Sequence, residues 1–290
     1  MGGDGNLRRG SRVPGDVRLW MLAFAVPAIL VAQDAREIVR RACELDRKNT
    51  EVARNYTYLE RDVESDLDRA SRPKNQQIRT WDVTLQEGSP YRRLVARNDQ
   101  PLSAAEQKQE QEKLDKSIEL RRKETEEQRQ RRIAEWERRR QRQREPLKEL
   151  PDAFNFQLSG EEALNGGQTF VIDATPKPGY RPKSTATSFF PKVRARLWID
   201  KSDYQWVKVE MESTDTISFA GFLLRLAKGA HLALEQTRVN QEVWLPKKVT
   251  LQASARLVLF KGFHKSVDMS FSDYKKFQTD SRIVSAGDKQ

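Results

Sequence analysis

The stretch VRARLWIDKSDYQWVKVEM, residues 193–211, decides the fold class. Apolar and polar residues alternate over Val193–Ile199 and again over Tyr204–Met211, and a period of two is typical of half-buried β-strands. A five-residue connection, Asp200–Tyr204, places both apolar sets on one face, whereas a four-residue connection would place charged residues there. The pattern therefore predicts an antiparallel hairpin with one apolar face.

Runs of the same kind occur on both sides of this hairpin. They are Tyr56–Ser65, Ile78–Gln86, Tyr91–Arg97, Phe154–Leu164, Thr169–Thr175, His231–Val239, Val249–Phe260 and Lys265–Phe277. Gly88-Ser89-Pro90 and Asn165-Gly166-Gly167 provide turns between two pairs of runs. Residues 216–227 fit either a buried strand or a short helix. About ten strands without a βαβ rhythm predict a mainly β (α+β) fold, built on a large curved antiparallel sheet or half-barrel.

Two segments have helical patterns instead. Apolar residues recur at near-helical spacing over residues 34–53, which predicts an amphipathic N-terminal helix. Residues 103–145 are almost wholly Glu, Gln, Lys and Arg, begin with a Ser103/Glu106 capping box, and should end before Pro146. This charged, solvated insertion keeps no heptad, so we expect no coiled coil. It forms either one helix of about 60 Å or a hairpin that folds back near Thr125.

The N-terminus has the three parts of a secretory signal peptide. Basic residues precede Leu19–Ala32, which contains no charge, and a strongly polar sequence follows. A membrane span needs about 20 apolar residues, so the alternative of an uncleaved anchor is less favoured. We expect cleavage after Ala32, or else after Gln33, and a soluble periplasmic or otherwise exported chain without a transmembrane span. The predicted organisation is a signal peptide at 1–32 and one half-barrel domain at 33–290, interrupted by the charged helical insertion 101–148.

The residues that usually carry chemistry are scarce. The chain has two His and one Cys, no zinc-site spacing, no GxSxG motif and no glycine-rich phosphate loop. We therefore expect no catalysis, no metal site and no cofactor. The lone Cys43 can form no intramolecular disulfide and lies too far from the apolar segment to be a lipid anchor. A net charge of +11 indicates an anionic partner, and export argues against nucleic acid.

One predicted strand contains small residues where a packed sheet usually has large ones. In Val249–Leu259 the inward positions include Ala253 and Ala255, which leave room for a ligand on a curved sheet. The alternative is that a helix packs closely against them. The predicted apolar cavity comprises Leu197, Ile199, Val207, Val209, Leu251, Ala253, Ala255, Leu257, Met269 and Phe271.

Three short motifs carry a resemblance to a known group of proteins. They are Asn55-Tyr56 after the first helix, Leu197-Trp198-Ile199-Asp200 with its return strand Val207–Glu210, and Val243-Trp244-Leu245-Pro246. In this order they resemble the periplasmic lipoprotein carriers and receptors of the LolA/LolB type and the lipoprotein-sensing domain of RseB. The resemblance implies an antiparallel half-barrel around an apolar cavity. The charged insertion departs from that pattern, and there is no lipidated Cys as in a membrane-bound receptor.

The resemblance and the missing chemistry together favour an exported binding protein for lipid, acyl chains or a lipidated protein. The alternative is a structural or regulatory envelope protein with a solid core that binds a protein partner through the charged helix. An exported hydrolase is the third possibility.

Overall fold

The structure is a computed structural model, and it describes residues 34–68, 70–219, 224–257, 263–277 and 283–285. The predicted signal peptide at 1–32 lies outside these residues. The helices are α1 (Ala35–Ala53), α2 (Ala104–Arg122) and α3 (Glu126–Ala153), with short 3-10 turns η1 (Thr185–Thr187) and η2 (Phe190–Lys192). None of the helices in the described ranges is long and apolar enough to cross a membrane.

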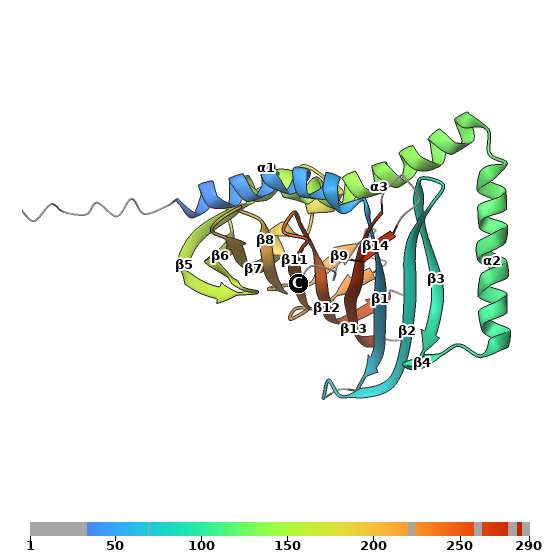
Figure 1. The fold of residues 1–290 in the computed structure, drawn as a ribbon. Coiled ribbons are helices and arrows are strands. Elements are labelled where there is room, and N and C mark those ends of the chain that lie inside the picture. Colours follow the sequence, from blue (N-terminus) through green and yellow to red (C-terminus); the bar gives the residue numbers. More distant parts are fainter. Residues whose placement is uncertain (1–33, 69, 220–223, 258–262, 278–282, 286–290) are drawn as a thin grey trace, which may run out of the picture. The chain divides into compact units, whose positions relative to one another are not determined.

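A single antiparallel sheet connects the described strands (Figure 1). Its long path joins β4 (Gln100–Pro101), β3 (Ser89–Arg97), β2 (Pro73–Gln86), β1 (Tyr56–Leu67), β13 (Phe263–Phe277), β12 (Val243–Leu257), β11 (His231–Val239), β8 (Trp206–Ser213), β7 (Val193–Asp200), β6 (Gly167–Pro176) and β5 (Phe154–Leu164). Three short strands, β9 (Ile217–Phe219), β10 (Leu224–Leu226) and β14 (Ile283–Ser285), pair beside this path. The sheet is open rather than closed into a barrel, which confirms the predicted fold class.

The central hairpin has the predicted register, with one exception. Leu197 on β7 lies opposite Val209 on β8, and Ala195 lies opposite Met211, so these apolar residues share a face. A bulge then pairs Ile199 with Trp206 and leaves the intervening residue, Val207, without a partner position. A bulge adds one residue to a strand and changes the direction of its side chains.

The displaced Val207 belongs to a different core from its predicted neighbours. It is fully buried with Val171, Trp198 and Trp244, whereas Leu197 and Ile199 belong to the main hydrophobic core. The sequence-based assignment of Val207 to the face of Leu197 is therefore wrong, because alternation alone cannot show a bulge.

Helix α1 supplies one wall of the main core. Asp34 accepts a hydrogen bond from the backbone N–H of Arg36 and so caps the helix. The buried face of α1 packs against residues of β5, β6, β7 and η2. The buried α1 residues are Ala35, Ile38, Val39 and Ala42. The predicted amphipathic helix is thus present and lies on the sheet.

The charged insertion forms two helices that meet at a corner. Capping boxes begin both, with Ser103 and Glu106 at α2 and with Thr125 and Gln128 at α3. The chain turns at residues 123–125, close to the predicted position, but α2 lies beside β3 whereas α3 runs along α1 (Figure 1). The insertion is therefore neither one continuous helix nor a simple folded-back hairpin.

Helix α3 continues through Pro146 and ends at Ala153, beyond residue 148, where the insertion was expected to end. The predicted helix end is therefore wrong. A proline inside a helix removes one hydrogen bond and costs about 3 kcal/mol. The last turns of α3 offset this cost because Leu147 and Leu150 pack against the main core and Ala153 is buried within it. The chain then passes directly into β5 at Phe154.

Candidate functional site: an aromatic pocket beneath helix α3

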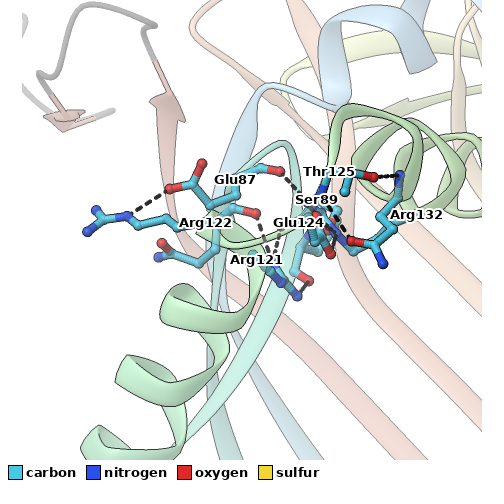
Figure 2. A network of polar contacts seen from close by, with 10 residues as sticks. Glu87, Ser89, Arg121, Arg122, Glu124, Thr125 and Arg132 are labelled. Carbon is cyan, nitrogen blue, oxygen red and sulfur yellow. Dashed lines mark hydrogen bonds and ion pairs between the residues drawn. The ribbon is translucent and has the colours of Figure 1, made fainter.

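The N-terminal part of α3 is held on the turn between β2 and β3 (Figure 2). Arg132 donates hydrogen bonds to the Ser89 hydroxyl at 2.6 Å and to the Glu87 carbonyl at 3.0 Å. The same guanidinium forms an ion pair with Glu124 at 2.6 Å. Arg121, at the end of α2, donates to the backbone carbonyls of Gln86 at 2.8 Å and of Ser89 at 3.1 Å. Arginine side chains from both helices thus hold this turn.

The second anchor joins α3 to α1. Arg144 contacts the carboxylate of Asp46, and Arg140 donates a hydrogen bond from Nη2 to the Thr50 carbonyl at 2.7 Å. Burial raises the pKa of Asp46, and the neighbouring Arg144 opposes that shift. Because Arg132, Arg140 and Arg144 recur at multiples of four residues, they lie along one face of the helix. This face carries the contacts with the turn and with α1.

A pocket of about 380 Å³ lies between these anchors, beneath α3. Helix α3 contributes Trp136, Arg140 and Gln143, and α1 and the residue after it contribute Thr50, Ala53 and Arg54. The other lining residues, from β1, β2, β3, β12 and β13, are Tyr56, Tyr58, Val83, Thr84, Leu85, Pro90, Leu245, Pro246, Phe271 and Tyr274. The charged insertion, the first helix and the sheet thus form the pocket together.

Aromatic rings form the wall of this pocket on the sheet. Tyr58 meets Phe271 edge to face with ring centroids 5.7 Å apart, and it lies 5.7 Å from the Tyr274 ring. The Tyr56 hydroxyl donates to Glu242 at 2.6 Å, and burial raises the pKa of Tyr56 to about 12. Burial also raises the pKa of Tyr274, whose hydroxyl donates to the Pro246 carbonyl. These phenols therefore remain neutral, and the wall is suited to an apolar ligand.

The ten residues predicted to line one cavity lie in several different surroundings. Leu197 and Ile199 are buried in the main core, and Val209 packs against it. Ala255 is buried opposite Leu226 of β10. Thus, close packing fills part of the face that was expected to be open.

Of the remaining predicted residues, only Phe271 lines the aromatic pocket. Leu251 is 39% exposed, and Ala253 and Met269 are half-buried. The side chain of Leu257 lies outside the described part of the structure. The sequence therefore identified one residue of the pocket and missed Tyr58, Tyr274 and Trp136.

The sequence does contain a pattern that points to Trp136, the pocket residue of α3 that was not predicted. Ile133, Trp136, Arg140 and Leu147 have spacings of three, four and seven, which place them on one helix face. That face could have been identified if arginine had been counted as a packing residue, because its aliphatic stem covers apolar surface.

A polar cluster continues the same sheet face beyond the apolar residues. Met269 on β13 lies opposite Asp62 on β1. The guanidinium of Arg92 donates to Glu60 at 2.7 Å and to Asp62 at 3.1 Å, and it lies over the Trp81 ring at 4.7 Å. Burial and the neighbouring Asp62 raise the pKa of Glu60 to about 7, while Arg92 opposes the shift. Arg92 therefore donates hydrogen bonds to two carboxyl groups.

The described residues contain no group of three or more His, Cys, Asp or Glu side chains arranged to hold a metal ion. The free thiol of Cys43 lies in the groove between α1 and α3, and burial raises its pKa to about 12. This thiol therefore stays protonated and is a poor nucleophile.

Comparisons with known proteins give structural matches only. No family model matches the chain, and no curated protein matches its sequence. A putative outer membrane lipoprotein-sorting protein domain from Vibrio parahaemolyticus has 12% identity and a TM-score of 0.33, over 84% of this chain and 95% of that one. A LolA superfamily protein from Nitrosomonas europaea has 11% identity and a TM-score of 0.29, over 85% of this chain and 94% of that one.

The Pseudomonas aeruginosa MucA/MucB complex also matches, at 10% identity and a TM-score of 0.25, over 85% of this chain and 100% of that chain. Two of these structures, the lipoprotein-sorting protein domain and the LolA superfamily protein, have names from the group that the sequence motifs resemble.

Proposed function

We propose that the chain is an exported, non-catalytic binding protein that holds an acyl chain, free or on a lipidated protein, in the aromatic pocket beneath α3. The observation that carries this proposal is the pocket itself, which is lined mainly by aromatic and aliphatic side chains. Its volume of about 380 Å³ lies within the range of about 300–1,000 Å³ that is usual for small-ligand sites. Burial of apolar surface at about 25 cal/mol per Å² would supply the affinity.

The proposed location is the periplasm or another exported compartment. Residues 1–32 have the composition of a signal peptide, and the proposed mature chain, 33–290, is one domain that includes α2 and α3. N-terminal sequencing of the exported protein should begin at Gln33 or Asp34. Recovery of the exported chain with Met1 intact would contradict this part of the proposal.

The pocket can be tested with one substitution made at two places. Ala53 lines the pocket, whereas Ala253 lies half-buried on the sheet face, away from the pocket lining. The added ring in Ala53→Phe should fill the pocket and abolish binding of a fluorescent fatty acid. Ala253→Phe should leave binding unchanged. Melting temperatures of both variants would show that each remains folded.

The two variants separate the possible sites. Loss of binding in Ala253→Phe but not in Ala53→Phe would move the ligand to the open part of the sheet and reject the pocket. A wild type that takes up no probe, and that carries no lipid by native mass spectrometry, would reject lipid binding. That result would favour the alternative of a protein partner bound through α2, which has no buried residue.

A further inference from the structure

The proposed pocket carries charge at one side only. Of its lining residues, only Arg54 and Arg140 are ionised at neutral pH, since the three tyrosines are neutral and no Asp, Glu, Lys or His is among them. The two arginines come from the end of α1 and from α3, whereas Tyr58, Phe271 and Tyr274 come from the sheet. A ligand in this pocket would therefore meet two cations from the helices and aromatic rings from the sheet.

Arg140 is held in a fixed position. Its Nη2 donates to the Thr50 carbonyl at 2.7 Å, and its Nη1 donates to Glu137 at 3.1 Å and 3.3 Å. The guanidinium carbon lies 5.1 Å from the centre of the Trp136 ring, and the side chain is only 18% exposed. Within the described residues its Nε donates no hydrogen bond. A guanidinium fixed in this way loses little conformational entropy when it binds an anion.

Arg54 is held less firmly. Within the described ranges its side chain makes no hydrogen bond, and the carboxylate oxygens nearest to its guanidinium in its ion pairs are those of Glu51 at 3.5 Å and Glu137 at 3.9 Å. Both glutamates line the neighbouring groove between α1 and α3 and not the pocket. The side chain of Arg54 is 48% exposed, so it can turn towards a charged group at the pocket mouth.

We infer that the pocket selects single-chain amphiphiles with an anionic head, a carboxylate or a phosphate, over neutral or cationic ones with the same chain. This inference rests on the proposed function and names its ligand class. The head would lie between Arg54 and Arg140 near solvent, and the chain would lie over Tyr58 and Phe271. Planar guanidinium groups match the geometry of carboxylate and phosphate oxygens, and the hydrogen bonds are charge-assisted.

The test compares four ligands that share a dodecyl chain, each below its micelle-forming concentration. Dodecanoate, dodecyl phosphate, dodecanol and dodecyltrimethylammonium compete with a fluorescent fatty acid for the wild-type protein. Both anions should bind at least about tenfold more tightly than dodecanol, as expected for one hydrogen bond to a charged group. The cation should bind more weakly than dodecanol. If dodecanoate binds more tightly than dodecyl phosphate, the natural ligand is a free fatty acid. The opposite order indicates a phosphorylated lipid.

Three arginine variants show whether the selection comes from this pocket. Arg140→Gln and Arg54→Gln should each lower the ratio of dodecanoate affinity to dodecanol affinity, and this ratio cancels any general effect of the substitution on the pocket. Arg92→Gln is the matched control, because Arg92 also lies over a tryptophan ring, that of Trp81, but lines no part of the pocket. It should keep the full preference. If Arg140→Gln does not fold, Arg54→Gln alone decides the result.

The outcomes separate the inference from the proposed function. If dodecanol binds the wild type as tightly as dodecanoate, and Ala53→Phe abolishes both, the pocket stands and the anion selection is rejected. An undiminished preference in both pocket variants would also reject it. If none of the four ligands competes and the probe itself does not bind, both proposals are rejected.

Discussion

The guanidinium of Arg132 donates a hydrogen bond to the buried hydroxyl of Ser89 at 2.6 Å, and this contact joins α3 to the turn between β2 and β3. The two residues are far apart in the sequence, and nothing in the composition of α3 distinguishes Arg132 from the other arginines around it. The contact is one of the two anchors that hold α3 across the pocket. The charged insertion is thus a structural part of the proposed binding site.

We predict that Arg132→Gln destabilises the protein by about 2 kcal/mol, since it removes charge-assisted hydrogen bonds and leaves Ser89 without its donor. Arg131→Gln, at the preceding position of α3, is the control, because Arg131 is exposed. Its free energy of unfolding should stay within about 0.5 kcal/mol of the wild type. Urea denaturation would measure both values. Equal effects of the two substitutions would mean that the anchor adds no stability.

The turn itself allows a second test. Gly88 and Gly166 have nearly the same backbone conformation, with φ of +84° and +82°. A Cβ atom at Gly88 would lie 2.9 Å from Cδ1 of Ile133 on α3, whereas one at Gly166 would meet no atom within 4 Å. Asn tolerates positive φ, so Gly166→Asn should cost little. Gly88→Asn should cost about 1 kcal/mol more than Gly166→Asn, because the new side chain must move the end of the Ile133 side chain.

Thermal and urea unfolding of both variants would measure the difference. The double variant Gly88→Asn/Ile133→Ala should lose less unfolding free energy than the two single variants lose in total, as expected for residues in contact. Strict additivity would contradict the docking of α3 on this turn.

The main hairpin could be predicted because its signal is local. Alternation over residues 193–211 and the length of the connection determine the face of Leu197 and Val209, and the structure has that register. The helix α1 could be predicted for the same reason, from the spacing of its apolar residues. The bulge at Val207 could not, because it changes the face of a residue without changing the pattern of the sequence.

The aromatic pocket could not be predicted, since its walls come from segments that only the tertiary fold brings together. The position of α3 depends on hydrogen bonds from Arg132 to the turn between β2 and β3, and on contacts of Arg140 and Arg144 with α1. In the sequence these arginines are part of a uniformly charged run that resembles a solvated helix. The continuation of α3 beyond Pro146 was missed because the packing of Leu147 and Leu150 offsets the cost of the proline.

The division of the predicted cavity leads to a third prediction. Ile199 is fully buried in the main core, whereas Leu251 is 39% exposed on the same sheet. Ile199→Ala should therefore destabilise the protein by about 2–5 kcal/mol, from lost burial and the cavity left behind. Leu251→Ala should cost less than about 1 kcal/mol, because little apolar surface is lost from the core. Similar costs, measured by urea denaturation, would mean that the two residues have similar surroundings.

The last prediction concerns the pH dependence of stability at the polar cluster. Burial raises the pKa of Glu60 from 4.5 to about 7, so between these values the folded protein holds a proton that the unfolded chain has lost. A raised pKa means that Glu60 contributes stability below about pH 4.5, and that this contribution is lost as pH rises through about 7. Glu60→Gln should therefore weaken the fall in unfolding free energy over this interval.

Glu64, on the same strand, is a control of opposite sign. A hydrogen bond from Lys265 lowers its pKa, so Glu64 contributes stability above the pKa of the unfolded chain and loses it as the solution is acidified. Glu64→Gln should leave the fall towards neutral pH unchanged and should weaken acid denaturation instead. Urea denaturation of both variants and the wild type across this pH range would measure the slopes. If Glu60→Gln changes stability equally at all pH values, then Glu60 does not titrate in this interval, and its contact with Arg92 outweighs its burial.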